Sequence, residues 1–530
     1  MSGSGRRSVD VVVVGGGAAG AVVAARASEH PDLEVLLVEA GPDYEAASTL
    51  PDDLVDGHRN SLVDHDWGLG YHPTGPAAAA PDAGPTGRSI DFPRGRVTGG
   101  STAVNTTIAL RGIPDDYDHW ASLGNPRWAW NEVLPAFRRL ERDLDYGTYP
   151  HHGDAGPITI RRWRPEELVP TQAAFIEAAR AIGHPPCEDV NRPDAEGVGI
   201  MAMNKLGRLR ISTAIGYLAP ARYRENLAIR PDTLAVRVLT ERGTDGLRAT
   251  GVEVRDPDGA VGVIDARLVV LCAGAIHTPG ILARSGIGAG DELTAIGVDV
   301  VAEVPGVGAN LSDHPALLVA LTAREPAMVA DDLPLVQTIS RYTTEGSDRE
   351  LDVNLELITR VPRRSGPPAF GIAASLEWVE GRGRVRQRSA DPAVHPIIES
   401  GFGVDERDVR RTVAALLDAI AVARQPVLGD LTEGIVFPDP ERSSPEELSA
   451  LARRSSGSGY HPVGTARMGP ADDAGAVVDQ HGRCHAVDGL AVADASIMPT
   501  VPRANTNLTS IMIGERIGEW LRTEPSRYGL

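Results

Sequence analysis

The feature that most constrains this chain is a glycine-rich turn between two apolar runs near its beginning. Four valines at residues 11–14 lead into Gly15-Gly16-Gly17-Ala18-Ala19-Gly20, a helix-forming run follows at residues 21–27, and a second apolar run at residues 35–38 ends at Glu39. This order predicts a βαβ unit whose glycines make a tight turn, let the backbone approach a pyrophosphate and let the helix pack on the strand. The acid at the tip of the second strand can accept hydrogen bonds from a ribose diol. The pattern favours a dinucleotide site over a glycine-rich turn without a ligand, with contacts at Gly15, Gly17, Ala18, Ala19, Gly20, Glu39 and Ala40.

The length of the chain indicates how many domains it forms, and its net charge limits the partners it can bind. A chain of 530 residues exceeds the usual range of one domain, so two domains are expected. The formal charge is −20, from 72 acidic and 52 basic residues, and no Lys/Arg cluster offsets it. Such a surface repels polyanions. We therefore expect no nucleic-acid partner.

The cysteines and the apolar runs bear on the compartment. Cys187, Cys272 and Cys484 lie far apart, without CxxC or metal-ligand spacing, which indicates a reducing compartment and no metal site. The short polar beginning does not resemble a signal peptide, and no apolar run reaches the roughly 18 residues of a membrane span. We expect a cytoplasmic protein without a membrane span.

Two further stretches precede the middle of the chain. Residues 41–85 form a long polar stretch, a length that is often functional, and Trp67 within it either pins the loop to the core or contacts a ligand. Residues 92–105 contain a second glycine-rich turn, which we expect to run into a helix. Two such turns indicate a long cofactor held at more than one point.

The remaining pattern predicts two domains, one of them discontinuous. The fully apolar run 268–271 is typical of a central parallel strand, and a helix reaching Arg284 follows it. Residues 351–359 and 370–379 alternate like strands with one polar face, and an amphipathic helix is expected at 407–424. The last part of the chain resembles the first in its pattern, with an apolar strand expected at 489–494 and a final helix at 509–521. It is therefore assigned to the cofactor domain.

Four motifs resemble those of the glucose–methanol–choline (GMC) flavoprotein oxidoreductases, and the resemblance covers essentially the whole chain. The first is the glycine turn with its acid, and the second is Gly95-Arg96-x-x-Gly99-Gly100-Ser101-Thr102-x-Val104-Asn105. The third begins at Gly274-Ala275 and ends at Ser285-Gly286-Ile287-Gly288. The fourth comprises Tyr460-His461-Pro462, Gly464-Thr465, Asp494-Ala495-Ser496 and Asn505-Thr506-Asn507. In detail the chain looks most similar to the bacterial choline dehydrogenase and hydroxymethylfurfural oxidase branch.

The resemblance implies an α/β fold and bound FAD rather than NAD. We expect a Rossmann-like FAD-binding domain, discontinuous at residues 1–156, 226–315 and 457–530, and an α+β substrate-binding domain with an antiparallel sheet at residues 157–225 and 316–456. Some relatives hold FAD covalently through a histidine just before the asparagine of the second motif. That place is Val104 here, so non-covalent FAD is expected; Thr98 also stands where an aliphatic residue is usual. The implied FAD contacts beyond the first turn are Trp67, Arg96, Gly99, Gly100, Ser101, Asn105, Thr106, Thr107, Ile108, Ala109, Ala235, Asp494, Ala495, Thr506 and Asn507.

The same resemblance implies the catalytic residues. His461 matches the family's proton acceptor, and imidazole suits that role because its pKa lies near neutrality. Asn505 matches the second catalytic position, where its amide would orient the alcohol oxygen. Without the resemblance, these would be a satisfied polar histidine and a turn-capping asparagine. Tyr460 is a candidate wall of the substrate pocket, whereas His314 and His485 are interpreted as structural.

The expected reaction is oxidation of a primary alcohol, aromatic alcohols included, to the aldehyde, with hydride transfer to flavin N5. Oxygen, a quinone or a redox protein would then take the electrons; the sequence does not distinguish an oxidase from a dehydrogenase. Choline is not favoured, because only 4% of residues are aromatic and a trimethylammonium cage needs aromatic faces. The alternatives are a hydroxynitrile-lyase-like enzyme with a redox-silent flavin and, disfavoured by the presence of His461 and Asn505, an inactive flavin-binding scaffold.

Overall fold

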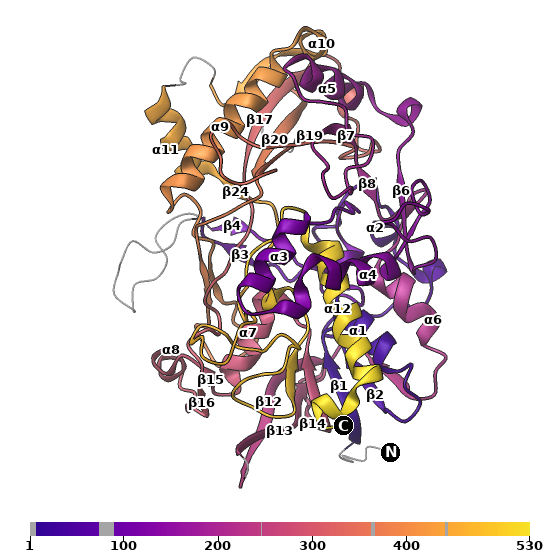
Figure 1. Ribbon diagram of the computed structural model, residues 1–530, viewed down its shortest axis with the longest axis vertical. Coiled ribbons are helices and arrows are strands. Elements are labelled where there is room, and N and C mark those ends of the chain that lie inside the picture. The colour runs from indigo at the N-terminus through magenta and orange to yellow at the C-terminus, as the bar shows by residue number, and fades with distance from the viewer. Residues whose placement is uncertain (1–6, 74–88, 245, 362–365, 440–443) are drawn as a thin grey trace.

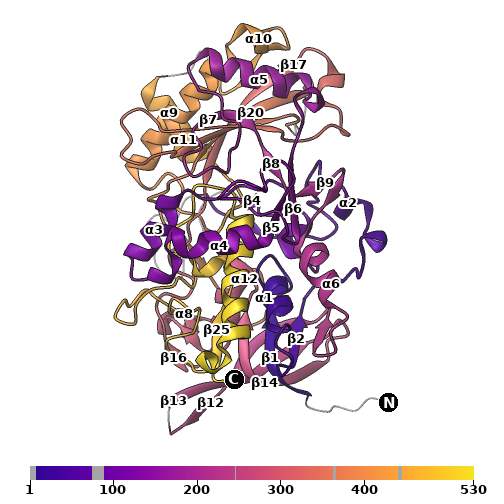
Figure 2. The same ribbon diagram turned by 45° about the vertical axis from the view of Figure 1, so that its right-hand side comes forward.

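A computed structural model of the protein describes residues 7–73, 89–244, 246–361, 366–439 and 444–530. Two seven-stranded sheets lie at opposite ends of the elongated molecule, and α3, α4 and the upper part of α12 lie between them (Figures 1 and 2). The first described strand, β1, belongs to the lower sheet, and the C-terminus lies near that sheet (Figure 1). The twelve α-helices of the described residues are α1 Gly20–Ala27, α2 Asp52–Val55, α3 Pro114–Ser122, α4 Trp130–Leu140, α5 Pro170–Ala181, α6 Ala219–Ala221, α7 Gly274–Arg284, α8 Gly290–Ala295, α9 Glu406–Ala423, α10 Pro426–Gly429, α11 Pro445–Ser455 and α12 Thr506–Thr523.

The lower sheet is built on the apolar runs that the sequence marks as buried strands. Its order is β11-β2-β1-β14-β13-β12, and β25 also pairs with β14. The pairs β11/β2, β2/β1, β1/β14 and β14/β25 are parallel, whereas β12 and β13 extend the sheet as an antiparallel hairpin. The strands are β1 Arg7–Val14, β2 Val35–Val38, β11 Leu227–Arg230, β12 Leu234–Gly243, β13 Gly246–Arg255, β14 Val261–Leu271 and β25 Leu490–Val492.

Segments far apart in the chain meet in this sheet and its helices. Val14 pairs with both Val38 and Leu271, and Leu271 pairs in turn with Val492. The C-terminal helix α12 packs on α1. A Cβ at Gly514 of α12 would lie 2.7 Å from the Ala19 carbonyl oxygen, so the absence of a side chain permits this close approach. The lower half of the molecule therefore uses the beginning, the middle and the end of the chain.

The upper sheet is antiparallel throughout, in the order β23-β17-β20-β19-β18-β7, with β24 also paired to β17. Helices α5 and α9 pack on it, and Figure 1 shows them on its upper side. Side chains alternate between the two faces of a strand, so the opposite face is left to look toward the middle of the molecule. The strands are β7 Gly197–Ile200, β17 Pro315–Ala323, β18 Thr338–Tyr342, β19 Val353–Ile358, β20 Ala369–Leu376, β23 Thr432–Phe437 and β24 Gly457–Ser458.

Shorter strands complete the fold. They are β3 Gly70–Tyr71, β4 Ile90–Asp91, β5 Glu141–Asp143, β6 Ile158–Arg162, β8 Ala202–Met203, β9 Lys205–Leu206, β10 Leu209–Arg210, β15 Ile287–Gly288, β16 Ala302–Glu303, β21 Arg384–Arg386 and β22 Ile397–Glu399.

The elements expected from the sequence are present at nearly the expected residues, with one correction. The second glycine-rich turn does not run into a helix; only a short 3₁₀ segment, Gly100–Ala103, follows it. Gly99 and Gly100 both have positive φ, at 97° and 51°, and the backbone then turns away at Val104. Two consecutive left-handed residues are incompatible with the start of an α-helix. Of the long stretch 41–85, residues 74–85 lie outside the described part.

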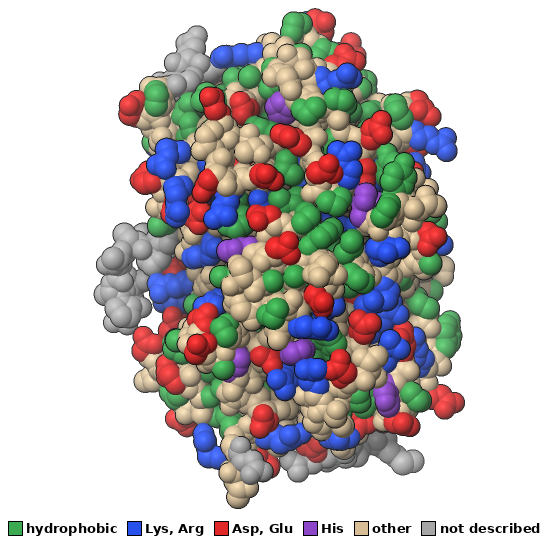
Figure 3. Space-filling view, viewed as in Figure 1, with side chains coloured by type: hydrophobic (Ala, Val, Ile, Leu, Met, Phe, Trp, Pro, Cys, Tyr) green, Lys and Arg blue, Asp and Glu red, His purple; other side chains and the backbone are tan. Residues whose placement is uncertain are grey.

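The surface charges, the apolar character of the helices and the cysteines can be compared with what the sequence predicts. On the face drawn in Figure 3, acidic and basic side chains are interspersed. None of the helices in the described ranges combines the length and the apolar character needed to cross a membrane. All three cysteines are buried and free.

Candidate active site

A cavity of about 750 Å³ lies between the two sheets. Its lower wall comes from the glycine turns and from the ends of β1, β2 and β14, and its upper wall from β17, β19 and β20. Its side includes the segments 458–462 and 505–507, which contain the predicted catalytic residues. Residues distant in the sequence therefore surround one space.

The first glycine turn has no room for side chains. A Cβ at Gly20 would lie 1.9 Å from the Gly15 carbonyl oxygen, and one at Gly15 would lie 2.6 Å from that of Cys272. Gly17 is different, because only the Gly100 Cα comes within 4 Å of a Cβ placed there. Gly15 and Gly20 thus allow close packing of backbone, while Gly17 faces the cavity.

The two glycine turns touch each other. The Gly99 amide donates to the Gly16 carbonyl oxygen at 2.7 Å, and a Cβ at Gly100 would lie 2.7 Å from the Gly17 Cα. This contact brings backbone amides from two distant segments to one end of the cavity. Such a cradle suits the phosphate part of an extended ligand.

Glu39 is held in place by backbone amides. Its two carboxylate oxygens accept hydrogen bonds from Gly16 at 2.7 Å and from Gly41 at 2.8 Å. Burial raises its pKa to about 7, although these hydrogen bonds favour the charged form. The carboxyl group lines the cavity and retains lone pairs for ribose hydroxyls.

Most of the predicted contact residues line the cavity, and four do not. Gly20, Gly99, Thr107 and Ala109 lie behind it. Gly99 and Thr107 have positive φ, and the Thr107 hydroxyl donates to the Gly57 carbonyl oxygen, so they shape the turns instead. The predicted residues that line the cavity are Gly15, Gly17, Ala18, Ala19, Glu39, Ala40, Trp67, Arg96, Gly100, Ser101, Asn105, Thr106, Ile108, Ala235, Tyr460, His461, Asp494, Ala495, Asn505, Thr506 and Asn507.

His461 and Asn505 meet at the cavity wall. The Asn505 Nδ2 atom lies 3.0 Å from the His461 Nε2 atom. Asn505 is the residue that precedes the first turn of α12, and its side chain makes no capping hydrogen bond, so its amide is free to face the histidine. His461 follows β24, which pairs with the beginning of β17. The fold thus joins two segments 44 residues apart in one pair.

A second histidine supports the first from behind. The Nδ1 atoms of His314 and His461 lie 3.0 Å apart, and His314 is fully buried. Asp313 accepts the His461 backbone amide at 2.8 Å. Glu377 places a carboxylate oxygen 3.5 Å from His314 Nδ1. The sequence indicates a structural role for His314, and the structure places its ring in contact with the predicted proton acceptor.

Burial decides the charge of both rings. It lowers the pKa of His461 well below 6.5, with His314 and Arg94 acting in the same direction, and it lowers the pKa of His314 to about 4. Two neutral rings that face each other through Nδ1 must share one proton, so one ring donates and the other accepts. When His461 is the donor, its Nε2 atom carries a lone pair directed toward Asn505 and the cavity.

Comparisons with known proteins identify the family. Models of the GMC oxidoreductases match residues 9–316 and 379–514. The chain belongs to the GMC oxidoreductase family. It is 36% identical to 5-(hydroxymethyl)furfural oxidase of Methylovorus sp. (strain MP688), over 97% of this chain and 99% of that protein. It is 33% identical to oxygen-dependent choline dehydrogenase 1 of Chromohalobacter salexigens, over 97% and 95% of the two chains. The crystal structure of pyridoxine 4-oxidase from Mesorbium loti superposes with a TM-score of 0.86 at 30% identity, covering 96% and 98%.

The cofactor of this GMC oxidoreductase is FAD, and the cavity fits it. The paired glycine turns suit the diphosphate, Glu39 suits a ribose, and the His461–Asn505 pair lies with Asn507 in the same space. Asn507 places a buried side-chain oxygen without a hydrogen-bond partner among the described residues, which leaves it available to a ligand. The protein is an FAD-dependent oxidoreductase of the alcohol-oxidising GMC enzymes.

Several residues of the cavity were not expected from the sequence. Arg94 donates to the Tyr460 carbonyl oxygen at 2.9 Å, and His277 packs against Trp67 with ring centroids 4.2 Å apart. Glu356 and Glu377 project from the upper sheet. Their strands were predicted, but no local motif indicates which face of that sheet meets the cofactor half. The unexpected lining residues include Arg94, His277, Arg284, Glu356, Glu377, Gln387 and His395.

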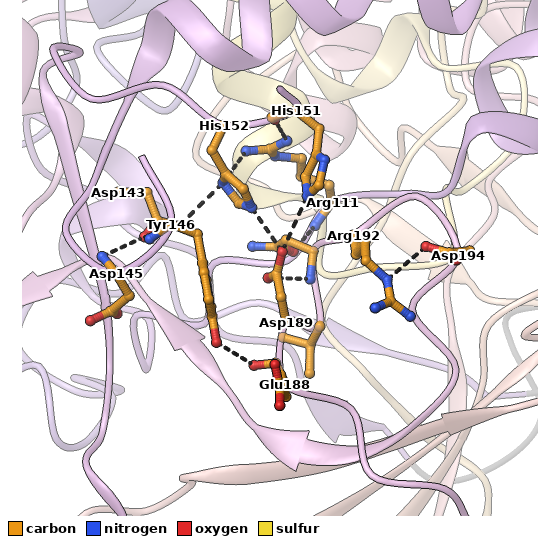
Figure 4. A network of polar contacts seen from close by, with 12 residues as sticks. Arg111, Asp143, Asp145, Tyr146, His151, His152, Glu188, Asp189, Arg192 and Asp194 are labelled. Carbon is orange, nitrogen blue, oxygen red and sulfur yellow. Dashed lines mark hydrogen bonds and ion pairs between the residues drawn. The ribbon is translucent and has the colours of Figure 1, made fainter. Parts of the chain in front are cut away.

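A separate polar network, at β5 and β6, does not line the cavity (Figure 4). His151, His152 and Asp189, and also Glu141, Asp143 and His152, come close enough to hold a metal ion. Their carboxylates are already paired with arginines, Glu141 with Arg111, and Asp143 and Asp189 with Arg162. We therefore interpret the network as a set of ion pairs among its own residues and not as a metal site.

Proposed function

We propose that this GMC oxidoreductase oxidises a primary alcohol, aromatic alcohols included, to the aldehyde, with His461 accepting the hydroxyl proton. The observation that carries the proposal is the contact of 3.0 Å between His461 Nε2 and Asn505 Nδ2 at the wall of the FAD cavity. An alcohol oxygen that enters between them can give its proton to the imidazole while the amide donates a hydrogen bond to the oxygen. The names of two relatives point the same way, because hydroxymethylfurfural is a primary alcohol on a ring and pyridoxine oxidase is a second alcohol-oxidising enzyme.

The roles of His461 and Asn505 in the proposed reaction follow from the chemistry of their side chains. Bound FAD supplies the hydride acceptor. His461 is neutral and half-buried, so it can take a proton without first losing one. Asn505 fixes the oxygen, and residues of the upper sheet line the opposite wall of the cavity. The electrons then pass to oxygen, a quinone or a redox protein.

We further propose that Tyr460 forms one wall of the alcohol pocket. It lines the cavity, has a positive φ of 66° and keeps its ring 6.3 Å from that of Phe92. Its conformation is held from both sides, because its amide donates to Ser458 and its carbonyl accepts from Arg94. Tyr460→Phe and Tyr460→Ala should change the ranking of alcohols; identical kinetics to the unchanged enzyme across several alcohols would remove this role.

The test is anaerobic mixing of the FAD-loaded enzyme with a panel of alcohols. Bleaching of the flavin absorbance supports the proposal. Unchanged absorbance with every alcohol, together with cleavage of a cyanohydrin, would replace it with a lyase. Adding oxygen, and in a parallel sample an artificial acceptor, to the bleached enzyme then distinguishes an oxidase from a dehydrogenase.

A further inference from the structure

Two glutamates project into the cavity from the upper sheet. Glu356 lies on β19, and Glu377 directly follows β20. Asn354 pairs with Ser375 in this antiparallel register, so residues 354 and 356 share a face with residues 373, 375 and 377. Helices α5 and α9 cover the opposite face. The register thus directs both carboxyl groups into the same space as His461.

Neither glutamate is neutralised by a cation among the described residues. The Glu356 side chain has no hydrogen bond or ion pair with any of them. Glu377 is 3% exposed, and its Oε2 atom lacks a hydrogen-bond partner within the described chain. The basic side chain within 4 Å of it among those residues is His314, which burial keeps neutral.

The arginine that acts electrostatically on Glu377 hydrogen-bonds other groups. Arg341 on β18 donates to the carbonyl oxygens of Val190 at 2.7 Å and Arg503 at 2.8 Å. It lowers the pKa of Glu377 through space, but burial prevails and the pKa rises to about 8. Burial and the charge of Glu377 together raise the pKa of Glu356, also to about 8. A cation entering the cavity would relieve both effects.

The lining that accompanies the two acids is mostly aliphatic. Leu335, Val336, Ile358 and Ala373 line the same cavity, the Ser375 hydroxyl hydrogen-bonds Glu377, and no aromatic residue of β19 or β20 lines the cavity. A quaternary ammonium group needs aromatic faces, because it has no N–H to donate. An ammonium group with N–H donors instead matches carboxylates, which only accept hydrogen bonds.

Building on the proposed function, we propose that Glu356 and Glu377 form a subsite for the primary or secondary ammonium group of an amino alcohol. The hydroxyl end of such a substrate reaches His461 and Asn505, and its ammonium end meets the two carboxylates. The acids then select among alcohols by charge and by the presence of N–H groups. They take no part in the transfer of hydride.

The experiment compares three alcohols that differ in one substituent. Para-methylbenzyl alcohol is neutral, para-(aminomethyl)benzyl alcohol carries a primary ammonium, and para-(trimethylammoniomethyl)benzyl alcohol carries a quaternary one. Charge-assisted hydrogen bonds predict that kcat/KM for the primary ammonium exceeds that of the neutral alcohol by about tenfold to a hundredfold. It should also exceed that of the quaternary compound. Equal values for the three would overturn the subsite.

Variants tie the preference to the two residues. Glu356→Gln keeps the shape and removes the charge, so the ratio of kcat/KM between the primary ammonium and the neutral alcohol should fall nearly to one. Glu356→Asp should keep part of the preference. Glu377 also contacts His314, so Glu377→Gln can lower kcat/KM for every alcohol alike. Its effect on the subsite is therefore measured by the ratio of kcat/KM between the primary ammonium and the neutral alcohol. The matched control is Glu433→Gln, which removes an exposed glutamate from β23 of the same sheet and should leave the ratio unchanged.

Binding without turnover gives an independent measure. Para-methylbenzylamine lacks the hydroxyl, so it should inhibit competitively and lose affinity in Glu356→Gln. Unaltered inhibition in that variant would contradict the subsite even if the variant lowered turnover. The two proposals fail differently: no flavin bleaching with any alcohol defeats the alcohol oxidation, whereas bleaching without a charge preference defeats only the subsite.

Discussion

His314 Nδ1 lies 3.0 Å from His461 Nδ1, so the proposed proton acceptor is oriented by a second imidazole rather than by a carboxylate. Both rings are neutral, because desolvation lowers the pKa of the half-buried His461 and of the fully buried His314, and only one proton can lie between them. The arrangement leaves His461 Nε2 for the cavity when His461 is the donor. His314 is therefore a positioning residue in this proposal, and a carboxylate oxygen of Glu377 lies 3.5 Å from its Nδ1 atom.

Removing the imidazole of His461 should stop turnover without releasing the cofactor. His461→Ala leaves the glycine cradle and Glu39 untouched, so the purified variant should remain yellow. Turnover should fall by roughly two to four orders of magnitude, the usual contribution of a general base. Flavin reduction measured in a stopped-flow instrument tests this, and His485→Ala is the control because His485 is exposed and does not line the cavity. Near-full activity of His461→Ala would remove it from the mechanism.

Replacing His314 should alter the pH profile as well as the rate. His314→Ala takes away the partner that orients the His461 ring, so kcat should fall by about tenfold to a hundredfold. In the unchanged enzyme, the lowered pKa of His461 keeps it unprotonated below its ordinary 6.5, so the acid limb of kcat/KM should lie below that value. The variant admits water beside His461, which should move that limb toward higher pH. A lower rate with an unmoved profile would mean that His314 is merely structural.

FAD should leave the protein on denaturation. Val104 stands where some relatives carry the linking histidine, and a buried valine offers no nucleophile to the flavin. Acid precipitation should therefore leave all flavin absorbance in the supernatant. Colour retained in the washed pellet would show a covalent link at another residue.

His152 should stabilise the fold most at mildly acid pH. Its Nδ1 and Nε2 atoms each lie 2.9 Å from a carboxylate oxygen, of Glu141 and Asp189, and carboxylates only accept, so both nitrogens must carry hydrogens (Figure 4). Burial lowers the pKa of His152, but these hydrogen bonds outweigh burial and the net pKa is raised. The stabilisation is therefore complete below the unfolded value of 6.5 and is lost as pH rises through the raised folded value.

The measurement compares thermal or denaturant unfolding of His152→Gln with that of the unchanged protein. Loss of the imidazolium removes its charge-assisted hydrogen bonds to Glu141 and Asp189, which keep their ion pairs with Arg111 and Arg162, and this should cost about 1.5–3 kcal/mol of unfolding free energy. The difference should be larger at about pH 6 than at about pH 9. The lowered pKa values of Glu141 and Asp189 keep both ionised over that interval, so they do not change the sign. His151→Gln is the control, since its contact with Asp189 is longer, at 3.4 Å.

Local patterns were sufficient for the elements and for most of the cofactor site. The strand at 35–38 and the helix ending at Ala27 lie where predicted, because apolar periodicity and turn glycines are local signals. The contact between His314 and His461 depends on the pairing of β17 with β24, which no local signal specifies. Glu356 likewise looks like an ordinary polar position of an alternating strand until the other domain is placed against it. The sequence therefore did not predict which side chains of the upper sheet face the cofactor half of the molecule.

The contact between the two glycine turns should be sensitive to a single methyl group. In Gly100→Ala the new Cβ would lie 2.7 Å from the Gly17 Cα, a distance that forces the turns apart. The backbone amides they bring together would then no longer face one phosphate group, so FAD affinity should fall by about tenfold or more. Gly207→Ala is the matched control, because Gly207 has a similar positive φ of 60° but nothing within 4 Å of the added carbon, and so separates backbone strain from the steric contact. Titration of the apoprotein with FAD, followed by flavin fluorescence, measures both variants. Equal affinities would show that the two turns need not touch to hold the cofactor.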